Sequence, residues 1–373
     1  MRQSTGKRRW APSTRPVPAA SPVSAAGQSS LNQSRTDRPN ISSEALLRPA
    51  LLLVPWSGVS LLLLGWLLFP AALTQVMFVP LLLSVVLFGL PHGALDHLVP
   101  RLLHWRWAGP KRNLALYLLL YAGLAFALLL SWHLAPPLAL WGFLVASLLH
   151  WGQGDLHFLE AVLGRTRRYW WSAPVAVLAR GSLPIVVSLL AFPDWFTRLS
   201  QGASRAFGTQ VLPGELLSGP GAAALLTALV AVLLLYVFDT AQASAQPMTE
   251  LGEAALLLAL FVTVPPPLAL GLYFTLWHAW RHLGRLLALS AEHLAPAPTQ
   301  PRLSWRFVAL ALPITGLALL LLAGLYLWAA PRVHDTETLV ALYLALIAAL
   351  TGPHALLVAA MDFRGAPSRN AVS

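Results

Sequence analysis

Four histidines of this chain lie inside stretches that otherwise have the composition of membrane-spanning helices. They are His92 in GLPHGALDH, His150 in HWGQGD, and His278 with His282 in WHAWRH. An ionisable side chain is costly in hydrocarbon, so histidines at membrane depth indicate a functional site. Neutral imidazole is the commonest metal ligand in proteins, and several imidazoles at one depth favour a metal site. The chain has no cysteine, so the ligands of such a metal are nitrogen or oxygen atoms.

The spacing of His278 and His282 supports this interpretation. Residues four apart share one face of a helix, and helices commonly give two ligands to one ion in this way. Arg281 is expected to point away from that face, toward the membrane interface. Tryptophans beside the histidines are interpreted as the wall of a pocket for a long apolar ligand: Trp151, Trp277 and Trp280.

Carboxylates follow two of these histidines. Asp96 comes four residues after His92, and Asp155 comes five residues after His150. A carboxylate can accept a hydrogen bond from an imidazole N–H and so fix its tautomer, and we expect this role for both. Gly152 and Gly154 are expected to permit close approach of another helix.

Three further histidines are less easily assigned. His354, in GPHALLV, also lies in an apolar stretch, and the sequence leaves open whether it is a fifth ligand, a substrate-pocket residue or a residue that orients a ligand. His157 and His97 fall nearer the expected ends of their helices and are less suited to be ligands.

The elements that must position these side chains are long apolar segments. About ten can be drawn, and most reach the roughly 20 residues that are needed to cross a bilayer. They are 46–69, 73–99, 113–134, 136–162, 172–192, 221–240, 250–264, 267–290, 306–330 and 337–361. We therefore predict an all-α, polytopic membrane helix bundle of about eight to ten transmembrane helices. The stretch at 250–264 is short and is the least secure as a crossing.

Basic residues support ten crossings with both termini in the cytosol. Lys and Arg accumulate on the cytosolic side of membrane proteins. With the N-terminus inside, all but four of the 25 basic residues fall on that side, the exceptions being Arg180, Arg198, Arg205 and Arg332. The histidines then lie on helices that run toward the cytosol, at similar depth.

Composition places the chain in the membrane and excludes several classes of protein. The hydrophobic fraction is 57% and the charged fraction 10%, against roughly 45–50% and 25% in soluble domains. The net charge of +11 is explained by basic residues around the apolar stretches, so no nucleic-acid partner is expected. Lys7 and Lys111 are the only lysines and both lie outside the spans, which excludes a rhodopsin with a retinal Schiff base.

The expected organisation has three parts. Residues 1–44 are rich in Ser, Pro and Arg and are predicted to be a disordered, basic cytosolic tail. Residues 45–362 form the transmembrane domain, and 363–373 are a short cytosolic tail. The expected location is the cell membrane, as a multi-pass protein.

Four motifs together resemble one known family. GLPHGALDH at 89–97, HWGQGD at 150–155, WHAWRH at 277–282 and GPHALLV at 352–358 are similar to motifs of the Brp/Blh family of membrane-embedded β-carotene 15,15'-dioxygenases. The resemblance covers about residues 75–362. It implies cleavage of β-carotene at its central double bond by O₂ to two all-trans-retinal molecules, in the membrane lipid. It also implies Fe(II) held by His92, His150, His278 and His282.

Two other functions compete with this one. A b-type haem protein also uses transmembrane histidines, as paired axial ligands, but three helices here are predicted to share one layer. A metal-ion or proton transporter can use histidines as a relay, but such a protein is expected to carry more acidic residues in its spans.

Overall fold

A backbone surrounded by lipid must satisfy its hydrogen bonds internally, and a helix does so within one segment. The computed structural model of the chain describes residues 47–209, 219–293 and 300–365, and the regular structure within these ranges is helical. The prediction of an all-α chain is therefore confirmed. The predicted tail at 1–44, and all but the first three residues of the one at 363–373, lie outside the described residues.

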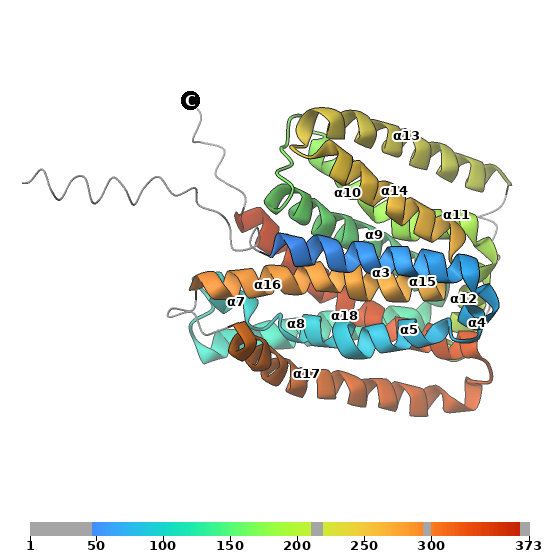
Figure 1. The fold of residues 1–373 in the computed structure, drawn as a ribbon. Helices are drawn as coiled ribbons and strands as arrows, with labels where there is room; N and C mark the ends of the chain where they lie inside the picture. The colour runs from blue at the N-terminus through green and yellow to red at the C-terminus, as the bar shows by residue number, and fades with distance from the viewer. Residues whose placement is uncertain (1–46, 210–218, 294–299, 366–373) are drawn as a thin grey trace, which may run out of the picture. The chain divides into compact units, whose positions relative to one another are not determined.

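Six helical stretches in the described part of the chain are long and apolar enough to cross a bilayer. They are α3 (Arg48–Leu68), α8 (Lys111–Leu134), the continuous stretch α10 (Ser172–Ser182), π-helical Leu183–Val187 and α11 (Ser188–Ala191), then α13 (Gly219–Ala243), α17 (Gln300–Ala329) and α18 (Thr336–Gly365). Each corresponds to one predicted span. The chain is therefore a polytopic membrane helix bundle (Figure 1).

The other four predicted spans are also helical, but they are interrupted, shorter or more polar. The first consists of α4 (Pro70–Gln75), α5 (Phe78–Ser84), π-helical Val85–Gly89 and α6 (Leu90–Ala94); the second is α9 (Pro136–Ala161); the third is α14 (Pro247–Thr263); the fourth consists of α15 (Pro266–Leu272), π-helical Tyr273–Ala279 and α16 (Trp280–His293). Two shorter helices, α7 (Val99–Leu102) and α12 (Pro193–Phe207), lie in connections. The number of crossings and the orientation of the termini stay predictions.

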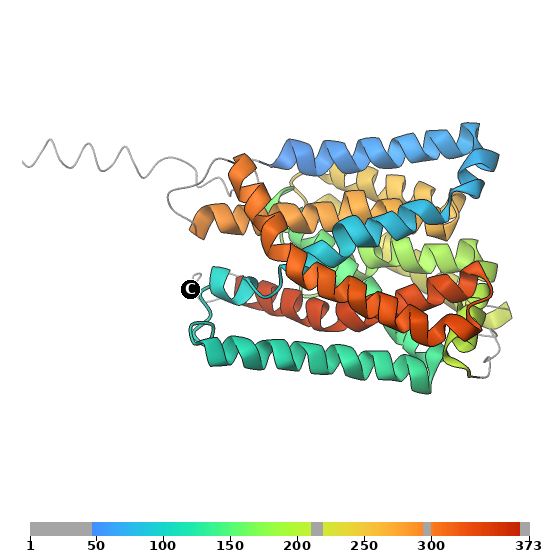
Figure 2. The ribbon, with the colours of Figure 1, turned by 90° about the horizontal axis from the view of Figure 1, so that it is seen from below.

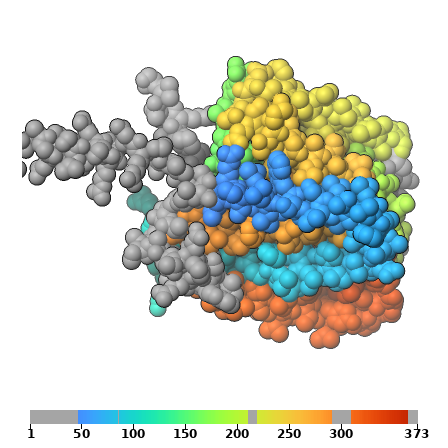
Figure 3. All heavy atoms as spheres, in the orientation of Figure 1, coloured from blue at the N-terminus to red at the C-terminus, as the bar shows by residue number. Residues whose placement is uncertain are grey.

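The peripheral helices expose many large apolar side chains. Leu119 of α8 is 70% exposed, and Leu234 of α13 is 66% exposed. Figure 3 shows one such face, on which α3, α13, α14 and α17 lie. Soluble proteins rarely expose apolar surface on this scale, so contact with lipid tails is its physical explanation.

Three helices inside the bundle carry several of its buried polar residues, among them His150, His282 and His354. α9, α16 and α18 run through the middle of the bundle (Figures 1 and 2), and α9 contacts both of the others. α9 and α10 are in backbone contact: a Cβ at Gly152 would lie 2.0 Å from the carbonyl oxygen of Val177. At Gly181 it would lie 1.9 Å from that of Leu148. The predicted close approach at Gly152 is therefore confirmed.

Candidate metal centre

Five imidazoles from five helical segments gather inside the bundle. His92 lies on α6, His150 on α9, His278 in the π-helical segment Tyr273–Ala279, His282 on α16 and His354 on α18. Each of these residues is at most 8% exposed. The four histidines singled out first in the sequence are thus brought together, and His354 joins them.

The rings stand in edge contact with one another. The ring centroids of His150 and His278 are 4.9 Å apart, and those of His92 and His282 are 5.6 Å apart. His92 and His278 are separated by 6.0 Å. The ring of His354 lies 4.8 Å from His92, 4.9 Å from His150 and 5.3 Å from His282.

Two π-helical segments help to place the histidines. Such segments break the regular helical register and are frequent at functional sites. Tyr273–Ala279 contains His278, and Val85–Gly89 comes directly before the helix of His92. The carbonyl of Phe88 accepts a hydrogen bond of 2.9 Å from Nδ1 of His92. Since a carbonyl only accepts, Nδ1 carries the proton and Nε2 of the neutral ring has the free lone pair.

Several buried nitrogens of this cluster lack hydrogen-bond partners. Among the described residues, no partner is found for Nε2 of His278, His282 or His354, or for either ring nitrogen of His150. An unsatisfied buried polar atom costs about 1–3 kcal/mol, so several in one place require an explanation. Imidazole nitrogen is a suitable ligand for iron, copper, nickel and zinc, and a bound cation would satisfy these atoms. Among the described residues no three side chains already stand close enough to enclose an ion.

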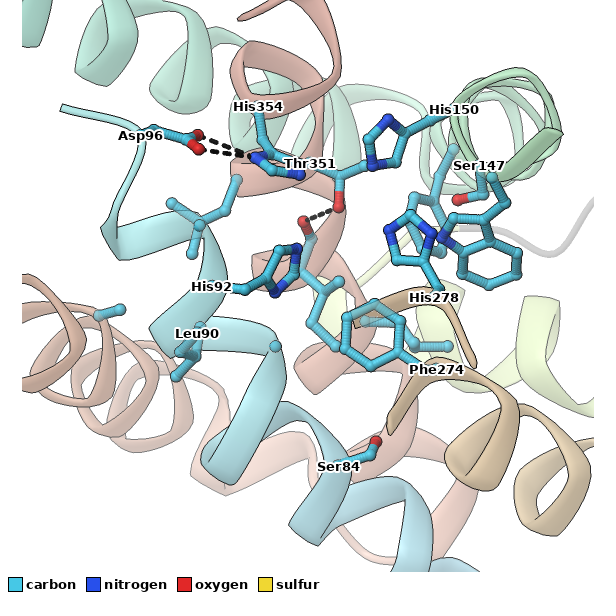
Figure 4. A pocket seen from close by; sticks show the side chains of 18 of the residues that line it. Ser84, Leu90, His92, Asp96, Ser147, His150, Phe274, His278, Thr351 and His354 are labelled. Atoms are coloured by element: carbon cyan, nitrogen blue, oxygen red, sulfur yellow. Dashed lines mark hydrogen bonds and ion pairs between the residues drawn. The ribbon is translucent and has the colours of Figure 1, made fainter. Parts of the chain in front are cut away.

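Asp96 does not take the partner expected from its spacing. It was predicted to fix the tautomer of a nearby imidazole, and His92 is the nearest in sequence. Its carboxylate instead accepts from Nδ1 of His354, at 3.0 and 2.9 Å to the two oxygens, and from the hydroxyl of Tyr121 at 3.0 Å. Figure 4 shows this pairing beside the cluster. The carboxylate therefore supports a different histidine, on a helix far away in the sequence.

Asp155 likewise pairs with groups other than histidine. It accepts from Arg180 at 2.8 Å, from Arg281 at 3.3 Å and from the indole of Trp277 at 3.0 Å. Glu253 accepts from Arg180 at 2.8 Å and is also paired with Arg281. Two carboxylates and two guanidinium groups thus form a buried, charge-balanced network that joins α9, α10, α14 and α16.

Arg281 corrects one expectation from the sequence. It does not reach the membrane interface but is 5% exposed and is held by the acidic network. Its guanidinium also lies 4.2 Å from the ring centroid of Trp277 and 3.6 Å from that of Phe158. Located between His278 and His282 in sequence, it anchors their helix to the rest of the bundle.

A second buried network was not predicted at all. Arg165 pairs with Asp239 and Glu250, and Thr240 and Ser172 donate to the same carboxylates. The sequence signal was the presence of ionisable residues within or beside apolar stretches, which are rarely unpaired in membranes.

An apolar cavity of about 220 Å³ opens beside the histidines. His92, His150, His278, His354 and Phe274 line it (Figure 4). Of the three tryptophans predicted to line a pocket, Trp151 also lines this cavity. Trp277 is fully buried and donates to Asp155, and Trp280 donates to the carbonyl of Ala50.

Two further cavities adjoin this one. A cavity of about 110 Å³ reaches toward Phe78 and Trp195. Six side chains line both it and the large cavity: Leu81, Leu144, Ile185, Leu199, Leu270 and Leu344. A cavity of about 20 Å³ lies against His150, His278 and His282 on the side of Arg281 and Arg285. It is large enough for about one water molecule.

Two further histidines, His97 and His157, lie outside the cluster. His97 lines the large cavity, and its Nδ1 bonds the carbonyl of Ala94 at 2.8 Å. His157 lines the smallest cavity, 4.0 Å from the carboxylate of Asp362.

Comparison with known proteins gives a consistent result. The model of a family described as beta-carotene 15,15'-dioxygenase matches residues 83–362, which include all five clustered histidines. The chain is 36% identical over 336 residues to the probable beta-carotene 15,15'-dioxygenase Blh of Halobacterium salinarum, covering 85% of this chain and 93% of that protein. It is 28% identical over 228 residues to the probable beta-carotene 15,15'-dioxygenase Brp of the same species, covering 58% and 60%. No solved structure matches.

Proposed function

The chain belongs to the beta-carotene 15,15'-dioxygenase family, and we propose that it cleaves the central double bond of β-carotene with O₂ to give two molecules of all-trans-retinal. Each aldehyde receives one oxygen atom. We further propose that the enzyme uses Fe(II) bound by His92, His150, His278 and His282. The observation that carries this is a cluster of unpartnered imidazole nitrogens in the wall of an apolar cavity. Fe(II) would supply the redox chemistry by which O₂ attacks the polyene.

The cavities suit a long apolar substrate that is cut in its middle. Such a substrate must extend from the histidines in two directions. Tyr117 and Tyr121 of α8 line the large cavity, and Leu144 and Leu344 line both it and the 110 Å³ cavity. At 1.5 Å of rise per residue, Leu344 lies roughly 15 Å along α18 from His354. The apolar lining therefore extends from the histidines to α8 and along α18, as a long apolar substrate requires.

An entrance from the lipid is also supported by the exposed residues. Leu118 of α8 lines the large cavity and is 42% exposed. Ile314 of α17 lines the same cavity. We propose that carotenoid dissolved in the membrane enters between these helices. The apolar lining would exclude water and hold the polyene by contact rather than by hydrogen bonds.

The competing functions find less support in the site. Haem ligation needs a flat gap between two axial histidines, whereas these rings are in edge contact with one another. Acidic residues are present in the membrane region, as a proton relay requires, but Asp155, Asp239, Glu250 and Glu253 are all paired with arginines. This pairing favours a structural role for them.

Expression in cells that make β-carotene tests the proposal. We expect loss of the orange colour, formation of retinal, and label from ¹⁸O₂ in the aldehyde. Metal analysis of the purified protein should find iron, and His278→Ala should abolish cleavage. The matched control is His133→Ala, which removes an exposed histidine at the end of α8. Intact β-carotene with the wild type, or full activity of His278→Ala, would refute the proposal.

A further inference from the structure

We propose that His354 is a fifth imidazole ligand of the metal and that Asp96 and Tyr121 hold it in position. The inference rests on the proposed metal site and adds a ligand to the four that the sequence motifs imply. It starts from the place of His354 within the cluster. The ring lies within 5.3 Å of the centroids of His92, His150 and His282, which makes it central rather than peripheral.

The hydrogen bonding of His354 leaves one nitrogen for a metal. A carboxylate only accepts, so the contact between Nδ1 and Asp96 places the proton on Nδ1. In the neutral ring, Nε2 then carries the lone pair. This atom is buried, and it has no hydrogen-bond partner among the residues that the structure describes. This is the arrangement of metal-bound histidines, whose second nitrogen commonly donates to a carboxylate that fixes the ring.

The charge of Asp96 gives an independent reason. The carboxylate is 3% exposed, and in the described part of the chain no lysine or arginine forms an ion pair with it. The other buried acids of the described residues, Asp155, Asp239, Glu250 and Glu253, each pair with arginine. A buried carboxylate without a cation is costly. A divalent cation on the far nitrogen of His354 would provide the missing positive charge through the ring.

Tyr121 completes the support. Its hydroxyl donates to Asp96 at 3.0 Å and lies on α8, while His354 lies on α18. The two helices are packed together, so Asp96, in the turn after α6, is held by α8 and α18 at one point. Removal of the Tyr121 hydroxyl should loosen the carboxylate but leave the imidazole in place.

Metal binding separates this role from a purely structural one. The protein is stripped with a chelator, reloaded with Fe(II) or Co(II), and compared with His354→Gln, Asp96→Asn, Tyr121→Phe and the control His133→Ala. Glutamine can still donate to Asp96, so His354→Gln keeps that hydrogen bond while losing the imidazole. Three properties are measured: metal per protein, the rate of metal loss to excess chelator, and the visible spectrum of the Co(II) form.

We expect loss of the supporting carboxylate in Asp96→Asn to weaken metal binding about 10- to 100-fold. His354→Gln should weaken metal binding more than Asp96→Asn does. It should also change the visible spectrum of the Co(II) form to one typical of a lower coordination number. Tyr121→Phe should have a smaller effect, and His133→Ala none. If His354→Gln and Asp96→Asn both match the control in spectrum and rate of loss, His354 is no ligand, although the four-histidine site stands. If the wild type binds no metal, the proposed function fails as well.

Discussion

Substitution of Gly152 by alanine tests how closely the site depends on helix packing. The added Cβ would lie 2.0 Å from the carbonyl oxygen of Val177, whereas ordinary contact begins at 3.4 Å. The obstacle is backbone, which cannot rotate away as a side chain would. The contact between α9 and α10 must therefore open by about 1.4 Å, the difference between these two distances.

Two consequences follow from such a displacement. Overpacking of this kind costs about 1–3 kcal/mol of unfolding free energy. His150 is only two residues from Gly152, so its imidazole should also move by about 1 Å, and misplacement on this scale reduces catalysis about 100-fold. Both losses should occur in the same variant.

The control is Gly142→Ala on the same helix. A Cβ at Gly142 meets no atom within 4 Å, so the change affects only helix propensity, by about 1 kcal/mol or less. Retinal formation is measured by chromatography in reconstituted liposomes, and thermal unfolding is measured in detergent. The reasoning is refuted if Gly152→Ala is as active and as stable as Gly142→Ala.

Three further predictions concern the second cavity, the buried charges and a helix cap. Leu144 lines both the large cavity and the 110 Å³ cavity, so Leu144→Trp should fill the space between them. Cleavage of β-carotene should fall at least 10-fold, whereas a shorter apocarotenoid should still be cleaved. Equal losses with the two substrates would contradict a substrate that extends into both cavities. Glu253→Gln leaves the buried Arg281 with less counter-charge, and should lower the free energy of unfolding in detergent by about 3–5 kcal/mol. Glu160→Gln, in the exposed pair with Arg167, should lower it by less than about 1 kcal/mol. Burial raises the pKa of Asp335, but hydrogen bonds at the start of α18 outweigh it and lower this pKa below the usual value. The Asp335 carboxylate caps α18 by accepting a hydrogen bond from the backbone N–H of Thr338. Its stabilising effect is present above the pKa of the unfolded state and is lost as pH falls through the pKa of the folded state. Asp335→Ala should therefore cost about 1 kcal/mol of unfolding free energy at pH 7 and less near pH 3, and an equal cost at the two pH values would argue against the cap.

Much of the fold follows from local sequence. Apolar stretches of about 20 residues predict membrane helices because lipid offers the backbone no hydrogen bonds. All ten predicted spans are helical in the structure, and six of them meet the length and hydropathy needed to cross. The interruptions before His92 and around His278 were not predicted, because a π-helical turn has no strong pattern of its own in the sequence.

The site was predictable in its members but not in its contacts. His92, His150, His278 and His282 stand out because a polar residue in an apolar stretch needs a reason to be there. The pairing of Asp96 with His354 could not be predicted in this way, because His354 lies 258 residues away on α18. Spacing along one helix suggested His92, but the backbone of Phe88 already accepts the proton of that ring.

The sequence by itself therefore determined that the chain is a membrane helix bundle with histidines in its spans, because both depend on the cost of placing polar groups in hydrocarbon. Only the tertiary structure decided which groups meet: that His354 joins the cluster, that Arg281 turns inward to Glu253, and that an apolar cavity lies beside the histidines. These depend on how helices rotate and approach one another. That geometry comes from contacts such as those at Gly152 and Gly181, which no single segment contains.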